Sequence, residues 1–317
     1  MATTNMPSKR SKKSNPTVTR LSFECPAGGA SQFIDVGLAL SILNRRAYRA
    51  GLYYYVNSIE VYNNERGVVD IHTAPDNWIT RNAHTRGEAI WDKMNELVKP
   101  PLTHGVLPKY HDYKVYLNPL HKTTGSLRPE LYDVNASGTT MTADDWVYSQ
   151  YVSADDDQDP IANADEFTAH LLGPHTGVAD NWTSIGLIDS YENTRAFPPS
   201  NSPTLDEPNL PIDPLVNIFD FSSEEQMNDI LTNLALDNDE APYDFDDYVG
   251  STMVMSHVAR IGTEVGLGRV GRASGFCAPF GLICIDPHSF DSGAGTAFRV
   301  VLNLAVGKYN GVFAERA

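Results

Sequence analysis

The chain contains few cysteines and no long apolar run. Its 317 residues include Cys25, Cys277 and Cys284, which are too few to form the disulfide network of a small secreted fold. The uncharged stretch over residues 273–285 is shorter than the ~18 apolar residues needed to span a bilayer. We therefore expect no membrane span, and either a reducing compartment or indifference to redox state.

Acidic residues are missing from the N-terminal segment. Residues 1–20 carry Lys and Arg among Ser, Thr, Asn and Pro, and they never reach an apolar run, so the sequence predicts no secretory leader. Such a segment cannot bury enough apolar surface to offset its ordering entropy. We expect a flexible basic arm over residues 1–20, followed by a folded body over residues 21–317.

Charge is distributed unevenly along the chain. The formal net charge is −16, yet residues 1–59 hold eight Lys or Arg and only Glu24 and Asp35 as acids. The body is therefore strongly acidic and repels polyanions, whereas the basic end attracts them. This division predicts different partners for the two parts of the chain.

Period-two alternation dominates the body. Residues 53–62 alternate aromatic and β-branched side chains, and residues 298–306 place Phe298, Val300, Leu302, Leu304 and Val306 on one face. Both patterns predict strands. Residues 63–67 read as a turn after which residues 68–73 return as a partner strand, and Asn310-Gly311 predicts a tight turn with positive φ. Further strands are expected at 112–117, 146–152, 182–191, 252–259 and 280–285.

Two short helices interrupt the β pattern. Apolar residues recur at helical spacing over residues 90–98 and over residues 227–234, as in amphipathic helices. The connections are long and rich in Pro, Asn and Asp, and no βαβ alternation appears, which favours a sandwich over a parallel sheet. The predicted fold class is therefore all-β: a single jelly-roll β-sandwich with long loop insertions and two short helices.

Several local motifs do not support catalysis. Residues 266–271 spell G-x-G-x-x-G, but Gly275 and Pro279 follow closely and make the required helix improbable on steric grounds. Ser274 lacks the G-x-S-x-G elbow. The nine histidines show no metal-binding spacing and are interpreted as structural or surface residues. We expect no enzymatic activity.

Two acidic clusters occur in the body. Asp155, Asp156, Asp157 and Asp159 form one, and residues 237–247 contain the other. Neither has the ligand spacing of a calcium-binding loop. We interpret both as solvated loops and predict no cofactor, with a weak Ca²⁺ site as the alternative.

The basic residues are the candidate functional site. Lys9, Arg10, Lys12 and Lys13 lie within five positions, and flexible arms of this kind neutralise phosphates without fixed geometry. Arginines next to aromatics suit single-stranded nucleic acid, where bases stack and phosphates pair; the alternative is an ordinary strand edge. The predicted nucleic-acid-binding set is Lys9, Arg10, Lys12, Lys13, Arg20, Arg45, Arg46 and Arg49, the last three leading into Tyr53-Tyr54-Tyr55.

A basic arm on a β-rich body resembles the capsid protein of small circular single-stranded DNA viruses that encode a replication initiator (CRESS-DNA viruses). The resemblance rests on the arm at residues 8–14, on residues 70–78 with the helix that follows, and on residues 299–306. It implies a jelly-roll capsid protein that self-assembles into an icosahedral shell around single-stranded DNA, with the arm inside. It also implies a virion location, passage through the host nucleus, and a host receptor.

Other classes remain open on the sequence alone. The chain could be the capsid protein of a small RNA virus. A β-sandwich that binds carbohydrate, or one that hydrolyses a substrate with Ca²⁺, would also fit the strands and acidic loops. A nuclear protein with a basic import signal is a further reading of residues 9–13.

Overall fold

The computed structural model describes residues 16–98, 112–132, 138–140, 146–153, 165–178, 181–193, 228, 253–263, 270–288, 290 and 295–316. These residues fall into two compact units. The first holds the described residues up to Ala74, those between 112 and 149, and those from Ser256 onward; the second holds Pro75–Val98 and the described part of 150–255.

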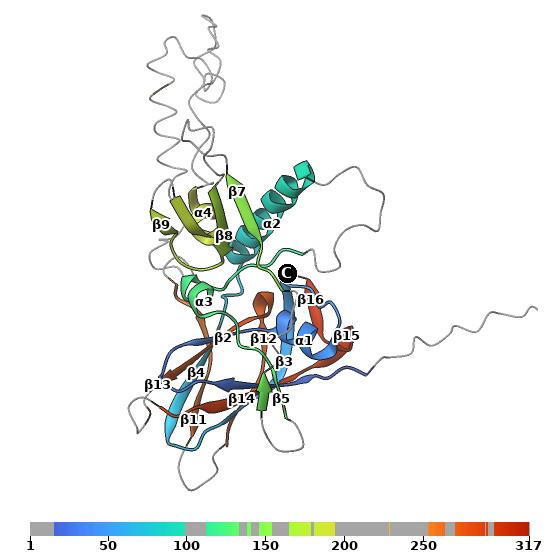
Figure 1. Cartoon of the computed structure of the whole chain (residues 1–317), viewed down its shortest axis with the longest axis vertical. Coiled ribbons are helices and arrows are strands. Elements are labelled where there is room, and N and C mark those ends of the chain that lie inside the picture. Colours follow the sequence, from blue (N-terminus) through green and yellow to red (C-terminus); the bar gives the residue numbers. More distant parts are fainter. Residues whose placement is uncertain are drawn as a thin grey trace, which may run out of the picture. The chain divides into compact units, whose positions relative to one another are not determined.

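The first unit contains two antiparallel sheets (Figure 1). Sheet one has the order β1-β14-β3-β12, and sheet two has the order β11-β4-β13-β2; a short strand, β16 (Ala314–Arg316), extends sheet one along β3. The bounds are β1 (Arg20–Cys25), β14 (Phe298–Leu304), β3 (Leu52–Tyr62) and β12 (Val270–Ala278) in sheet one, and β11 (Ser256–Thr263), β4 (Gly67–Thr73), β13 (Leu282–His288) and β2 (Gln32–Asp35) in sheet two.

The order of these strands along the chain defines a jelly roll. If β16 is set aside, each connection between consecutive strands of these two sheets crosses from one sheet to the other, except that β4 and β11 pair within sheet two. Eight strands wound in this way form the double-sheet jelly-roll sandwich. The predicted fold class is confirmed, and the second unit is an insertion in the connection between β4 and β11.

The predicted hairpin over residues 53–73 is wrong in its pairing. Both strands exist, but β3 belongs to sheet one and β4 to sheet two. The turn at residues 63–67 therefore carries the chain across the sandwich. Alternation identifies which face of a strand is buried, and it does not identify the strand beside it.

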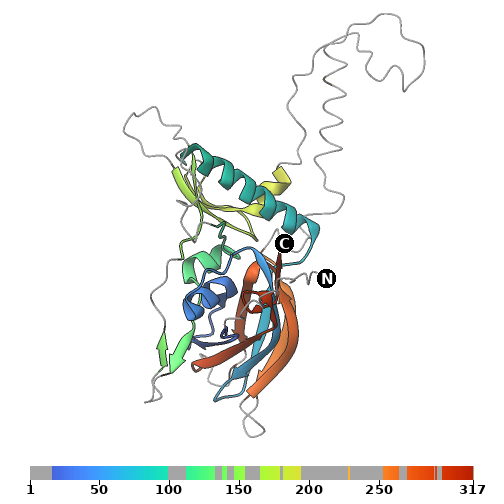
Figure 2. The same ribbon diagram turned by 90° about the vertical axis from the view of Figure 1, so that its right-hand side faces the viewer.

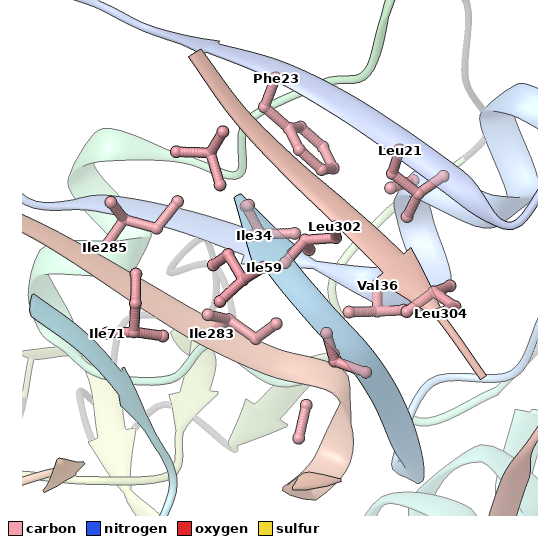
Figure 3. Close-up of a cluster of buried hydrophobic side chains, with 14 of the residues drawn as sticks. Leu21, Phe23, Ile34, Val36, Ile59, Ile71, Ile283, Ile285, Leu302 and Leu304 are labelled. Carbon is pink, nitrogen blue, oxygen red and sulfur yellow. The ribbon is translucent and has the colours of Figure 1, made fainter. Parts of the chain in front are cut away.

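The core lies between the two sheets. Leu21, Ile59 and Leu302 of sheet one are fully buried with Ile71 and Ile283 of sheet two. Figure 3 shows these side chains pointing into the same space from both sheets. Phe298, Val300, Leu302 and Leu304 share the buried face as predicted, whereas Val306 is 79% exposed because it follows the end of β14 in the next strand.

Shorter elements surround the sandwich. They are α1 (Val36–Asn44), α3 (Pro119–Thr124), β5 (Glu130–Tyr132), β6 (Gly138–Thr140), β15 (Val306–Tyr309) and the 3₁₀ turn η2 (Pro279–Gly281). The predicted tight turn after β15 is confirmed, because Asn310 has φ 47° and Gly311 has φ 97°. Positive φ at both central residues matches the twist of a hairpin.

The second unit combines helices with a small sheet. Its strand order is β7-β8-β10-β9, with β8 and β10 parallel, and α2 lies along one face of this sheet (Figure 2). Tyr151 of β7 is buried and donates its hydroxyl to the Gly87 carbonyl of α2 at 2.9 Å. The bounds are α2 (Trp78–Val98), α4 (Leu187–Asn193), β7 (Gln150–Ser153), β8 (Asp165–His170), β9 (Thr176–Val178) and β10 (Asn181–Gly186).

Several predicted boundaries change. The first helix begins at Trp78, before the predicted residue 90, because Asn77 accepts the Thr80 N–H at 2.9 Å and caps it. Residues 112–117 form no strand, and the strand predicted over 182–191 ends at Gly186, where α4 follows. The second predicted helix lies outside the described residues except for Asn228, which is helical.

The structure also bears on the membrane prediction. Within the described ranges, none of the helices combines the length and the apolar composition that a bilayer span requires.

Candidate nucleic-acid interface

Helix α1 presents the second basic cluster at its C-terminal end. The helix starts at Asp35, whose Oδ1 accepts the Leu38 N–H at 3.1 Å, and its residues 36–40 are buried. It ends at Arg45, which takes the left-handed conformation with φ 51° and ψ 41°. This reversal ends the helix and leaves the Arg45 side chain exposed.

The chain preceding β1 is held beside the same helix end. Asn44 brackets the backbone of Val18: its Oδ1 accepts the Val18 N–H at 2.8 Å, and its Nδ2 donates to the Val18 carbonyl at 3.1 Å. The Thr19 carbonyl accepts the Leu304 N–H at 2.9 Å, and β1 then starts at Arg20. Residues 16–19 therefore bond to the body although the sequence assigned them to the arm.

Arg46 contacts this incoming segment directly. Its Nη1 donates to Thr17 Oγ1 at 3.1 Å and its Nη2 donates to the Pro16 carbonyl at 3.4 Å. Both acceptors are neutral, so these two bonds do not pair the guanidinium with a negative charge.

Arg49 lies close to the other end of the chain. Its backbone N–H donates to the Tyr309 hydroxyl at 2.9 Å, and its side chain is exposed. Lys308, next to Tyr309, is a further exposed cation. Asp112, which accepts the Ala50 N–H, pairs with Lys114. Arg45, Arg46 and Arg49 thus gather at the end of α1, with Arg45 and Arg49 exposed, and we call these three residues the α1-end cluster.

Arg20 lies in a different environment. Its Nη2 is 3.3 Å from Glu60 Oε2 on the outer face of sheet one, and Arg272 pairs with the other oxygen of the same carboxylate. Hydrogen bonds from Arg272 and Tyr62 lower the pKa of Glu60. Arg20 is therefore the outer partner of a buried carboxylate.

The aromatic run next to the arginines does not line this surface. Tyr54 is 1% exposed and donates its hydroxyl to the Arg49 carbonyl at 2.6 Å, and Tyr53 is 6% exposed. Only Tyr55 of the three is partly exposed, with its ring 4.6 Å from Phe313. Tyr53 and Tyr54 are packed inside the sandwich, so their rings are not available for the stacking with nucleic-acid bases that the sequence had predicted.

The structure brings together only part of the predicted set. Arg45, Arg46 and Arg49 gather at the end of α1, Arg20 lies in sheet one, and Lys9, Arg10, Lys12 and Lys13 lie outside the described residues. Sequence reasoning missed the bracketing role of Asn44. No local signal could have shown it, because Asn44 acts through Val18, which lies 26 residues away in the chain.

Two serine–histidine contacts lack the geometry of an activated nucleophile. His121 Nδ1 accepts the Leu117 N–H at 2.9 Å, and its Nε2 is 2.7 Å from Ser126 Oγ. The neutral ring therefore carries its proton on Nε2 and cannot take the Ser126 proton. The other contact joins His170 to Ser184, which is fully buried. Burial also lowers the pKa of His121 to about 3, as expected for a core histidine.

Metal and phosphate sites find no support in the described ranges. No three His, Cys, Asp or Glu side chains among the described residues are grouped so that they could hold a metal ion. Both acidic clusters, at 155–159 and 237–247, lie outside those residues. The glycine-rich motif leads from Val270 into strand β12, whereas a dinucleotide fold requires a helix there.

Comparison of the chain with protein-family models, with curated protein sequences and with solved structures finds no match.

Proposed function

We propose that this chain is a viral capsid protein that assembles into a closed icosahedral shell around single-stranded DNA, with its basic N-terminal segment facing inward. One observation supports the proposal most: residue 16, the point where the basic segment meets the jelly roll, lies beside the α1-end cluster. Arginines therefore gather where that segment joins a body of opposite charge. Jelly rolls serve in capsid shells, and also in lectins and cupins, so the argument depends on charge as well as fold.

The charge arrangement fits phosphate neutralisation. The basic segment supplies Lys9, Arg10, Lys12 and Lys13, which can pair with phosphates in any geometry. Arg45 and Arg49 add exposed guanidinium groups at the end of α1. The acidic remainder of the chain repels nucleic acid, which favours binding from this one side.

Assembly and nucleic-acid content provide the test. We expect the purified full chain to form closed shells by electron microscopy and to carry nucleic acid that DNase degrades after disassembly. A chain that stays monomeric at every salt concentration and pH would contradict the proposal. Nucleic acid degraded only by RNase would overturn the DNA assignment.

The contacts of residues 16–19 indicate where the basic segment can be truncated without disturbing the fold. Deletion of residues 1–15 spares residues 16–19, which bond to the body, so the fold should be retained while co-purified nucleic acid falls. A matched variant replaces Lys9, Arg10, Lys12 and Lys13 by Gln at full length. Equal nucleic-acid content in the wild type and both variants would refute the role of the arm.

A further inference from the structure

The segment that precedes β1 is fixed by three separate parts of the first unit. Asn44, the last residue of α1, bonds both polar groups of the Val18 backbone. The turn after β15 accepts the Thr17 hydroxyl at the Asn310 carbonyl, at 2.8 Å. The end of β14 bonds Thr19 through the Leu304 N–H. Residues 16–19 are thus oriented before the sheet begins.

The turn after β15 is shaped to receive this segment. A Cβ placed on Gly311 would lie 2.4 Å from Thr17 Oγ1, and Gly311 has φ 97°. Its lack of a side chain therefore serves both the turn and the close approach of Thr17. The carbonyl of Asn310 also accepts the hydroxyl of Tyr48, which is 1% exposed, at 3.0 Å. The receiving surface is therefore anchored in the core.

Arg46 holds the same segment through its guanidinium group. Its planar fork reaches Thr17 Oγ1 and the Pro16 carbonyl with two different nitrogens. A lysine keeps the charge but has a single ammonium on a flexible stem, so it cannot reproduce this fork. Arg45 and Arg49, its neighbours in the α1-end cluster, are more exposed.

We propose that Asn44, Arg46 and the Asn310-Gly311 turn form a bracket that fixes where the basic arm leaves the jelly roll, and that Arg46 is a positioning residue for the arm. The bracket directs the chain out beside Arg45 and Arg49, so arm and cluster face one polyanion together. The inference rests on the proposed function only for the identity of what the arm binds. Arg46 is thereby reassigned from nucleic-acid contact to support of the arm.

Hydrogen exchange of the full chain tests the bracket without nucleic acid. The Val18 N–H, bonded to Asn44, should exchange severalfold faster in Arg46→Ala and in Asn44→Ala. Exchange of the Val18 N–H should be equally fast in Arg46→Lys, because a lysine keeps the charge but cannot make the two guanidinium hydrogen bonds. Arg45→Lys is the matched control and should exchange like the wild type. Wild-type exchange of Val18 in Arg46→Lys would overturn the proposal.

Binding of a single-stranded oligothymidylate separates positioning from phosphate contact. For single strands, the slope of log K against log salt falls by about 0.7 for each lost phosphate contact. We expect that loss in Arg45→Ala and in Arg49→Ala, and an unchanged slope in Arg46→Ala. A loss in Arg46→Ala equal to that in Arg45→Ala would overturn the positioning role. Absence of binding by the wild type would instead refute the proposed function, and the exchange data would still decide the bracket.

Discussion

Single carboxylates on the outer faces of the sandwich set its response to acid. Asp70 of sheet two has a side chain that is only 7% exposed, and Arg260 holds it through two hydrogen bonds of 2.8 and 2.7 Å. These bonds lower the pKa of Asp70 to about 2. The group therefore stabilises the fold above its ordinary pKa of about 4, and this contribution is lost as the pH falls toward 2.

Replacing Asp70 tests this linkage. We expect Asp70→Asn to lower the free energy of unfolding at pH 7 by about 1–3 kcal/mol and to reduce the decrease in stability between pH 4 and pH 2. Urea titrations at several pH values measure both effects. Asp76→Asn is the matched control, because Asp76 pairs with Arg81 on the surface and should change stability by less than about 1 kcal/mol. Similar losses in both variants would contradict the prediction.

Asp35 has the opposite linkage. It is 3% exposed at the start of α1, near Asp112 and Lys114, and Tyr148 donates its hydroxyl to Oδ2 at 3.5 Å. Burial raises the pKa of Asp35 to about 7. Between pH 4 and pH 7 the unfolded chain loses this proton while the folded protein keeps it, so stability falls as the pH rises through that window.

The change in stability that Asp35 causes between pH 4 and pH 7 is large enough to measure. A pKa difference of about three between the folded and unfolded states changes the free energy of unfolding by at most about 4 kcal/mol. Asp35→Asn can still accept the Leu38 N–H as a helix cap, and it should flatten the stability profile between pH 4 and pH 7. Asp92→Asn, at an exposed position of α2, is the control and should leave the dependence of stability on pH unchanged. A profile of Asp35→Asn that parallels the wild type would show that Asp35 is ionised in the folded protein.

Among the elements, the strands follow sequence pattern more closely than the helices do. β14 and β3 could be predicted from alternation alone, because buried apolar side chains recur at every second residue over most of each strand. The predicted length of helix α2 is too short because polar residues and Gly87 interrupt the apolar spacing in its first half. Its buried face is recognisable only in the packed structure. Helix α1 was missed because its apolar run has the texture of a buried strand.

The central strand of sheet one offers a test at this scale. Val300 of β14 is fully buried and Val306 of β15 is 79% exposed. We expect Val300→Ala to destabilise the first unit by about 2 kcal/mol, through lost burial and the cavity left behind. Val306→Ala should cost less than about 0.5 kcal/mol. Equal midpoints of thermal unfolding for the two variants would contradict the assignment of the core.

At the scale of the whole molecule, charge division predicts two opposite responses to salt. The net charge of −16 makes copies of the chain repel one another, and salt screens that repulsion. Association measured by light scattering should therefore increase as NaCl is added, whereas binding of single-stranded DNA should decrease. Deletion of residues 1–15 should weaken the DNA response and preserve the association response. If the two responses of the full chain have the same sign, the division of charge does not govern its partners.

Local pattern was sufficient to predict the buried faces of β3 and β14, the position of the Asn310-Gly311 turn, and the division of charge along the chain. Each of these depends on neighbouring residues and on the fixed geometry of the backbone. The folded sandwich was needed to show that β3 and β4 lie in different sheets, that Glu60 pairs with Arg20, and that Asn44 and Arg46 bond to residues 16–19. Those pairings join residues far apart in the chain. Many partners are compatible with the same local pattern, and only packing of the complete sandwich selects among them.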